Sequence, residues 1–228
     1  MTTCLVVGAG PGLGAAFARV FSREGMRVAL AARDVSRLEP VCRETGAKAF
    51  ACDATREADV LRLFEGVEKA LGAPQLVIYN ASWRKRGPIA ELEAQDIQAA
   101  LAVTAFGGFL VGREAARRML PKGSGAIFFT GASASVKGYA QSAAFAMGKF
   151  ALRGLAQSMA RELAPKGIHV AHFVIDGAIR NPGRVEPPDK PDSMLDPMAI
   201  AETYLRIYQQ PRSAWTWEME LRPWLETF

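Results

Sequence analysis

Short apolar runs alternate with longer amphipathic stretches along most of the chain. The runs are rich in Val, Ile, Leu and Ala, as is typical of parallel strands that are buried on both faces. The amphipathic stretches repeat their apolar residues at helical spacing, as in the series Leu13, Ala16, Phe17, Val20 and Phe21. This alternation predicts an α/β fold in which a doubly wound parallel sheet of about seven strands lies between two layers of helices.

The apolar runs give approximate positions for the strands of this sheet. We expect them at residues 4–8, 27–32, 49–53, 75–79, 126–135, 168–175 and 214–221, with a last helix at residues 198–208. Neither a linker nor a change in composition divides the 228 residues, so we expect a single domain over residues 1–228. The first strand leaves no room for a signal peptide, and no apolar run is long enough to span a bilayer, so we expect a cytoplasmic protein without membrane contact.

Charge and cysteine content add little to this picture. The formal charge is +5, but the basic residues are interleaved with acidic ones, apart from one cluster at residues 84–86. This dispersion favours a solvated surface over nucleic-acid binding. The three cysteines, Cys4, Cys42 and Cys52, lack the spacing of a disulfide pair or a metal site, and all lie in or beside apolar segments. We expect three buried thiols and no bound metal.

A glycine-rich turn joins the first apolar run to the first amphipathic stretch, with Gly8, Gly10, Gly12 and Gly14 around Leu13. Glycine lets the backbone turn tightly and approach a pyrophosphate, which the positive end of the following helix stabilises. The turn predicts a dinucleotide site in a Rossmann-type sheet, with a purely structural tight turn as the alternative. The spacing of Gly8, Gly12 and Gly14 resembles the Gly-x-x-x-Gly-x-Gly turn of the short-chain dehydrogenase/reductase family.

The second apolar run ends at Arg33, where a carboxylate would favour NAD. A guanidinium attracts the 2′-phosphate of NADP instead, so the resemblance predicts NADP in preference to NAD. Members of the family that prefer NADP often carry a second basic residue just before the middle glycine, a position that Pro11 occupies here. Alternatively, Arg33 is a solvated surface residue, with Asp34 as its ion-pair partner or as the cap of the next helix.

The resemblance extends over roughly residues 1–180 and implies further cofactor contacts. Asp53 matches an aspartate that contacts the adenine ring, although a role at the start of the next helix explains it equally well. Asn80 matches an asparagine that supports the sheet and lines the cofactor cleft. Gly177 and Ile179 match a glycine and a branched residue near the nicotinamide amide.

Residues 142–152 resemble the active-site helix of the family, whose Tyr-x-x-x-Lys motif carries the acid and base chemistry. Lys149 matches the lysine, which in the family also bonds the nicotinamide ribose, but Phe145 stands in place of the tyrosine. A benzene ring can neither donate nor accept a proton. Ala132 stands in place of the family's serine and Thr104 in place of its asparagine, so three of the four working positions depart from the pattern.

No other side chain takes over the lost chemistry at the expected spacing. Ser133 follows the serine position, and the alternation of an extended segment points its side chain away from the site unless a bulge intervenes, which makes it a weak catalytic candidate. Tyr139 lies six residues before Phe145, which does not fit the motif. The enoyl reductases of the extended family place their tyrosine seven residues before the lysine, but that position is Ser142 here. His169 and His172 are three residues apart, so on a strand they face opposite sides and form no chelating pair; core histidines are the expectation.

Two functions therefore remain open. The chain is either an NADP(H)-binding oxidoreductase of the short-chain type with an atypical active site, or a catalytically silent nucleotide-binding regulatory or partner protein. The substrate cannot be read from the sequence.

Asp176 is either a group for altered substrate chemistry or a cap. Residues 181–192 predict a lid over the substrate, and the cluster at residues 84–86 falls near the same mouth, where it would favour an acidic substrate.

The end of the chain predicts how copies of it associate. Three tryptophans, Trp215, Trp217 and Trp224, lie in this tail, and such side chains often anchor subunit contacts. Closure of the core explains them as well. The family usually assembles through two long helices and its C-terminal segment, so the resemblance implies a homodimer or a homotetramer.

Overall fold

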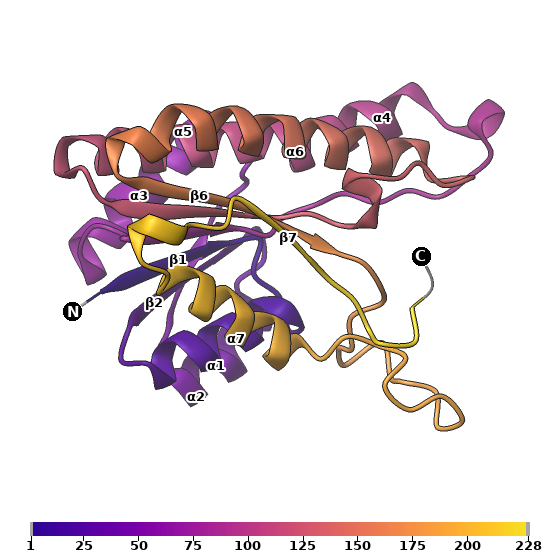
Figure 1. The fold of residues 1–228 in the computed structure, drawn as a ribbon, viewed down its shortest axis with the longest axis horizontal. Coiled ribbons are helices and arrows are strands. Elements are labelled where there is room, and N and C mark those ends of the chain that lie inside the picture. Colours follow the sequence, from indigo (N-terminus) through magenta and orange to yellow (C-terminus); the bar gives the residue numbers. More distant parts are fainter. Residues whose placement is uncertain (1, 227–228) are drawn as a thin grey trace.

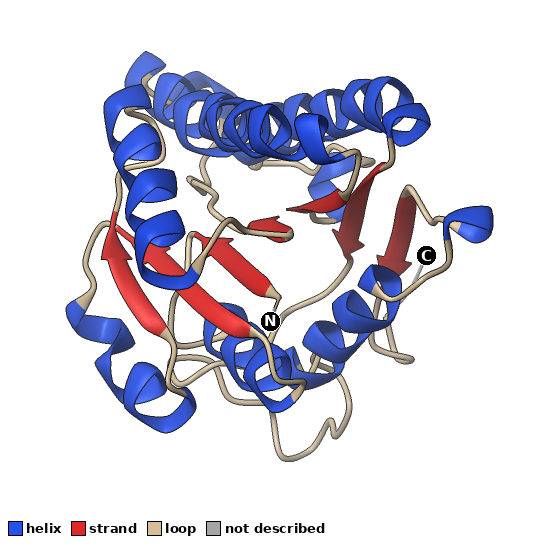
Figure 2. Ribbon diagram, turned by 90° about the vertical axis from the view of Figure 1, so that its left-hand side faces the viewer, coloured by secondary structure: helices blue, strands red, loops and turns tan. Residues whose placement is uncertain are grey.

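Seven parallel strands form one sheet in the computed structural model, which describes residues 2–226. Figure 2 shows this sheet as a twisted central layer with helices on either side. The strand order is β3-β2-β1-β4-β5-β6-β7. The strands are β1 (Thr3–Val7), β2 (Arg27–Ala32), β3 (Lys48–Ala51), β4 (Leu76–Tyr79), β5 (Gly125–Thr130), β6 (Ile168–Ile175) and β7 (Glu218–Leu221). The predicted doubly wound α/β fold is confirmed.

The helices form two layers, one on each face of the sheet (Figure 1). One layer contains α3 (Glu57–Leu71), α5 (Gly107–Met119) and α6 (Ala143–Leu163). The other contains α1 (Leu13–Arg23), α2 (Glu39–Thr45) and α7 (Pro197–Tyr208). The short helix α4 (Ala94–Ala100) continues through a π-helical segment, η3 (Leu101–Phe106), into α5. Each connection between successive strands contains a helix that packs on one face of the sheet, and it leads to a parallel strand, as the alternation of apolar and amphipathic segments predicted.

Alternating side chains of each strand build two separate cores. In β1, Cys4 and Val6 face the layer of α1 and α7, whereas Leu5 and Val7 face the layer of α3, α5 and α6. The apolar stripe of α1 that the sequence predicted is fully packed against the first of these cores, with Phe17 at its centre beside Tyr204. Because both faces of the sheet are covered, its strands need apolar residues at every position rather than at alternate ones.

The order of the strands reverses between β1 and β4. β1 pairs with β2 on one side and with β4 on the other, so the loops that leave these two strands diverge toward opposite faces. In open α/β sheets, such a switch point leaves a crevice outside the carboxyl ends of the strands. The glycine-rich turn after β1 and Asn80 after β4 meet there, because the Asn80 side chain donates a hydrogen bond to the carbonyl oxygen of Gly8 (3.0 Å).

Some boundaries differ from the sequence expectation. β5 ends at Thr130, after which residues 133–135 form a short 3-10 helix, η5 (Ser133–Ser135), instead of more strand. β7 is confined to the last four residues of the predicted range because Arg212–Ala214 form a 3-10 turn. Cys4 and Cys52 are buried as expected, but Cys42 is only half-buried because it lies near the open side of α2.

The helical stretch Ala94–Lys122 is long and apolar enough to cross a membrane by length and composition alone. Here it lies along one face of the sheet, and 33% of its most apolar window is buried in the protein. The buried part includes Leu110, Val111 and Ala115, which belong to the core beneath α5. A helix that covers a sheet meets the same criterion, so the stretch gives weak support to a membrane span.

Candidate functional site

The glycine-rich turn brings the backbone of β1 close to that of β4. Gly8 has a φ of +85°, and a β-carbon there would collide with the backbone of Ala81. A β-carbon on Gly14 would lie 2.8 Å from the α-carbon of Ala9, so the turn could not fold back onto the start of α1. Gly10 has open space around it. Two of the four glycines are therefore required by the packing of the turn itself.

A cavity of about 360 Å³ opens beside this turn. Gly8, Gly10 and Pro11 line one side of it, and Arg33 and Asp53 lie across from them at the ends of β2 and β3. The walls are backbone amides, small side chains and charged groups, which suits a polar, phosphate-bearing ligand. The structure thus brings together the residues that the sequence predicted for the adenosine half of a dinucleotide.

A second cation lines the same cavity and was missed by the sequence reasoning. Arg37 lies four residues after Arg33, in the short turn η1 (Ser36–Leu38) that precedes α2. Asp34 does not pair with Arg33; its carboxylate accepts hydrogen bonds from the backbone and the hydroxyl of Ser36 (3.0 and 2.7 Å). Among residues 2–226, Arg33 and Arg37 form no ion pair. The sequence offered only the nearness of Arg37 to Arg33 as a signal, because residues 33–35 are not helical and the fold of this turn decides where the Arg37 side chain lies.

Asp53 has a local role as well as a place in the cavity. Its carboxylate accepts hydrogen bonds from the backbone N–H and the hydroxyl of Thr55 (3.0 and 2.7 Å). These bonds lower the pKa of Asp53, and the charge of Arg33 lowers it further. The two residues form a turn ahead of α3 rather than its first turn, because α3 begins at Glu57. One oxygen of Asp53 is held by Thr55, and the side chain still lines the cavity.

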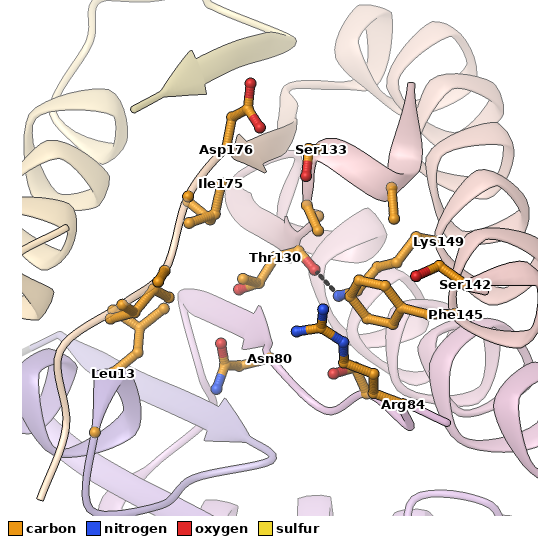
Figure 3. A pocket seen from close by; sticks show the side chains of 18 of the residues that line it. Leu13, Asn80, Arg84, Thr130, Ser133, Ser142, Phe145, Lys149, Ile175 and Asp176 are labelled. Atoms are coloured by element: carbon orange, nitrogen blue, oxygen red, sulfur yellow. Dashed lines mark hydrogen bonds between the residues drawn. The ribbon is translucent and has the colours of Figure 1, made fainter. Parts of the chain in front are cut away.

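A larger cavity of about 540 Å³ lies farther along the carboxyl edge of the sheet, and Asn80 and Ser82 line both cavities. Figure 3 shows residues of its walls, which come from the start of α1, from the segments at the carboxyl ends of β4, β5 and β6, and from the first turns of α6. Most residues predicted for the nicotinamide half and for catalysis line it: Gly12, Leu13, Asn80, Ala132, Ser133, Phe145, Lys149, Gly177 and Ile179. The topology thus joins segments that are up to 167 residues apart, from Gly12 to Ile179.

Lys149 is buried at the base of this cavity and is not a surface lysine. Its side chain is 3% exposed, and its amine donates a hydrogen bond to the carbonyl oxygen of Thr130 (2.7 Å) (Figure 3). Burial lowers the pKa of Lys149 to about 7, since charge is costly away from water. The amine can therefore exist in both its charged and its neutral form near neutral pH.

Phe145 lies one helical turn before Lys149 and lines the same cavity. The Lys149 nitrogen lies 5.8 Å from the centre of its ring, and the guanidinium carbon of Arg84 lies 5.2 Å from it. The ring brings an apolar surface to the position that the family's tyrosine occupies, and it supports two cations through its π-electrons.

Ser133 lies in a different local structure from the one expected. The segment after β5 is not extended at this residue but enters η5, so the alternation of strand side chains does not apply there. As a result, Ala132 and Ser133 both line the larger cavity. The hydroxyl of Ser135 accepts a hydrogen bond from the backbone of Ala132 (3.1 Å), which holds this turn.

The short chain dehydrogenase family model matches residues 2–183. The chain belongs to this family. A human relative, 3-oxoacyl-[acyl-carrier-protein] reductase, is 30% identical over 169 residues, which is 73% of this chain and 71% of the relative. A short-chain dehydrogenase from Rhodopseudomonas palustris has a similar structure, with a TM-score of 0.84, 40% identity and coverage of 98% of this chain and 99% of the other. These relatives of the chain are dehydrogenases and reductases, and the chain is an oxidoreductase of this family.

A metagenomic short-chain oxidoreductase, solved in complex with NADP, is also similar in structure. Its TM-score is 0.85 at 28% identity, and the match covers 98% of each chain. Because this match reaches well beyond residue 183, the similarity includes the segment that follows β6 as well as the glycine-rich turn.

Thr104 stands at the asparagine position of short-chain dehydrogenases, but it does not line either cavity. It is fully buried in η3, and its hydroxyl accepts a hydrogen bond from the backbone N–H of Trp83 (3.1 Å). Gly148 of α6 packs directly against it, since a β-carbon there would lie 3.0 Å from that of Thr104. Its contacts tie the loop after β4 to the helical layer, a role that the sequence did not indicate.

Asp176 lies at the end of β6, and its carboxylate has cationic partners. Arg222 contacts it at 3.1 Å and Lys137 at 3.6 Å, so it is neither a helix cap nor an unpaired acid. The next residue, Gly177, has a φ of +146° and packs against Pro223. Ile179 then bridges to Leu195 at the base of the loop between β6 and α7. Figure 1 shows this loop projecting from the carboxyl edge of the sheet.

Two other groups of residues noted in the sequence lie in and around the site. Tyr139 lines the larger cavity and is 45% exposed. It is the tyrosine among the residues that line this cavity. His169 stacks on Trp215 (4.7 Å between ring centres), whereas His172 lies on the other side of β6 and contacts Glu218 (3.0 Å). Within residues 2–226, no group of three or more His, Cys, Asp or Glu side chains is arranged to hold a metal ion.

Proposed function

We propose that this protein is an NADP(H)-dependent oxidoreductase that interconverts a carbonyl compound and its alcohol. One observation carries the proposal. Two cavities follow the carboxyl edge of the sheet and share Asn80 and Ser82, with the glycine turn in one and Lys149 in the other. An extended dinucleotide needs a groove of this kind, with a phosphate cradle in the middle and a reactive end beside a group that can move a proton.

The residues around the groove fit a nicotinamide dinucleotide. The N-terminus of α1, at Gly12 and Leu13, presents backbone amides toward the groove and favours a pyrophosphate. By resemblance to the family, Asp53 would contact the adenine ring, and Gly177 and Ile179 would contact the nicotinamide amide; their positions in the lining of the two cavities support these roles. The similar oxidoreductase that was solved with NADP supports this assignment.

We propose a preference for NADP over NAD on the basis of two cations. Arg33 and Arg37 line the adenosine cavity and form no ion pair among residues 2–226. A 2′-phosphate would bring charge-assisted hydrogen bonds that the 2′-hydroxyl of NAD cannot supply. The second cation, Arg37, compensates for the absence of a basic residue at Pro11.

We also propose that Lys149 moves the proton itself. A bound dihydronicotinamide would supply the hydride, and the oxygen of the reduced carbonyl group then needs a proton. Phe145 and Ala132 offer none, but the Lys149 ammonium has a pKa of about 7, close to the value at which a proton donor works best at neutral pH. Its hydrogen bond to Thr130 would hold the amine in place between turnovers. Ser133 and Tyr139 line the same cavity and would act in orienting the substrate.

A catalytically silent nucleotide-binding protein is the second candidate. The observation that favours it is the loss of hydroxyl groups at Phe145 and Ala132, together with the position of Thr104 outside the cavity. Proton transfer by a positioned side chain contributes about a hundredfold to ten-thousandfold to such reactions. A protein that keeps the cofactor groove and loses this contribution would bind the nucleotide without turning it over.

Titration with NADPH and NADH, followed by turnover on a panel of aldehydes and ketones, tests these functions. We expect NADPH to bind about tenfold more tightly than NADH or better, and the double variant Arg33→Gln/Arg37→Gln to lose this preference. Arg206→Gln, an exposed change on α7 away from both cavities, is the control. Tight NADPH binding without any oxidation of it favours the silent protein, and binding of neither nucleotide contradicts both candidates.

We further propose that the protein is a homodimer or a homotetramer that assembles through α5, α6 and the preceding η3. Exposed apolar side chains gather on these neighbouring helices: Phe106, Phe109, Met147 and Phe150 are 39–50% exposed. Phe106 stacks on Phe109, with 6.2 Å between the ring centres. A second copy of the chain would cover this surface with an identical one, as in a twofold symmetric interface.

A further inference from the structure

Three guanidinium groups surround the mouth of the larger cavity. Arg84 and Arg86 come from the loop after β4, and Arg184 comes from the loop after β6. They are close enough to act on one another, because burial first, and then the charges of Arg86 and Arg184, lower the pKa of Arg84. Two loops that are far apart in the sequence thus concentrate positive charge at one opening.

These three cations have no carboxylate partner within residues 2–226. Elsewhere the protein pairs arginines that lie partly in its interior, as with Arg153 and Glu218 (2.6 Å). All three side chains are exposed, and only Arg84 is partly desolvated. Like charges that face one opening without partners repel one another, which raises the free energy of the site. A bound anion would remove this cost, which is the behaviour of a ligand site rather than of a structural ion-pair network.

The acidic groups of the cavity do not cancel this charge. Asp176 and Glu226 are the carboxylates among its lining residues. Asp176 is already held by Arg222 and Lys137, at 3.1 and 3.6 Å. Glu226 contributes one negative charge, which is fewer than the positive charges of the three guanidinium groups. Lys149 can add a further positive charge at the base of the cavity.

Phe145 orients the guanidinium group of Arg84. The guanidinium carbon of Arg84 lies 5.2 Å from the centre of the ring, within the range of a cation–π contact. Figure 3 shows Arg84 reaching from the loop after β4 to the ring, and the Lys149 amine lies 5.8 Å from the centre of the same ring. Stacking on a ring leaves the edge of a guanidinium free to donate hydrogen bonds in its plane. The aromatic ring without a hydroxyl therefore positions a cation beside the group that moves the proton.

We propose that Arg84, Arg86 and Arg184 bind the anionic group of the substrate, so that the protein acts on carbonyl compounds that carry a carboxylate or a phosphate group. Arg84 is the central donor, because its planar N–H groups match the two oxygens of such an anion. Arg86 and Arg184 complete the site from the two loops at the mouth. That the bound anion belongs to a substrate rests on the proposed oxidoreductase function. That an anion binds here rests on the cavity alone.

Calorimetric titration with matched probes tests the inference. The probes are 4-formylbenzoate and 4-formylphenyl phosphate, each compared with the uncharged methyl ester of 4-formylbenzoate, and each is titrated into the protein with and without saturating NADPH. We expect one or both anions to bind at least about tenfold more tightly than the ester. Arg84→Gln and Arg184→Gln should each remove most of this difference. Lys85→Gln, a neighbouring exposed residue that does not line the cavity, should retain it.

Three results would overturn the inference. The first is equal binding of both anions and the ester, and the second is an anion preference that persists in both arginine variants. The third is displacement of NADPH by the anions, which would assign the three arginines to the phosphates of the nucleotide. Failure of the proposed function is distinct: NADPH then does not bind to the wild-type protein, while the titrations without nucleotide still measure the anion site.

Discussion

At the scale of single residues, Lys149 and Phe145 carry most of what is unusual in this protein. In a motif helix with a tyrosine, the lysine would have a phenol one turn away; here it has a benzene ring at 5.8 Å and the carbonyl oxygen of Thr130 at 2.7 Å. A carbonyl oxygen and a π-face compensate only part of the lost hydration. The low pKa of Lys149 follows from this burial, and it has a consequence for stability as well as for catalysis.

We predict that Lys149→Met changes the pH dependence of stability in the absence of nucleotide. The folded pKa of about 7 lies below the unfolded value of about 10.4, so the unfolded chain binds an extra proton between these values. The free energy of unfolding of the wild type should therefore rise with pH across this window, by up to about 1.4 kcal/mol per pH unit from this group. Urea denaturation from pH 6 to pH 10 measures it.

The variant lacks this contribution. Its advantage over the wild type should be largest at pH 6 and should shrink steadily above about pH 7. Curves that stay parallel for the two proteins would show that Lys149 keeps its ordinary pKa in the folded state.

At the scale of elements, the π-helical segment η3 links the helical layer to the loop that carries Arg84. Thr104 lies in this segment, buried against Gly148 of α6, and accepts the hydrogen bond of the Trp83 backbone. An extra residue in a helical turn reorients the side chains that follow, and such turns often occur at functional sites. Here the turn serves to hold the residue next to Arg84, and through it the mouth of the cavity.

We predict that Thr104→Val destabilises the protein although it preserves the shape of the side chain. The change leaves the Trp83 N–H without its acceptor, which costs about 1–3 kcal/mol when the group is buried. Thr104→Ser keeps the hydroxyl and serves as the control, with a smaller loss from the missing methyl group. Chemical denaturation compares the three proteins. Equal stability of the valine variant and the wild type would mean that water replaces the hydroxyl without cost.

At the scale of the whole molecule, the two faces of the sheet are covered differently. α1 and α7 pack against each other and bring Phe17 and Tyr204 into contact, with 4.7 Å between their rings. On the opposite face, α5 and α6 lie side by side (Figure 1) and leave apolar residues such as Met147 and Phe150 46% and 45% exposed. Apolar side chains that cluster on a long helix pair favour association, because a second copy would remove them from water.

We predict that the double variant Met147→Glu/Phe150→Glu is a monomer, whereas the wild type is a dimer or a tetramer. The two residues lie three apart on α6, so both carboxylates would enter the same interface without partners. Light scattering coupled to size-exclusion chromatography measures the masses. Val185→Glu is the control, because Val185 is 82% exposed in the loop after β6, away from these helices. A monomeric wild type, or an oligomer unaffected by the double variant, would contradict the prediction.

The sequence by itself determined the sheet, the glycine-rich turn and the segment of the chain in which each site residue lies. These depend on periodicity and on short motifs, which are local properties. The pairing of cavity residues is different, since it depends on which loops meet at the edge of the sheet. Only the tertiary structure placed Arg37 beside Arg33, turned Ser133 into η5, and buried Thr104 away from the cavity. It also brought Arg184 to Arg84, because β4 and β6 both pair with β5 in parallel, so the loops after them leave from the same edge of the sheet although these residues are 100 positions apart.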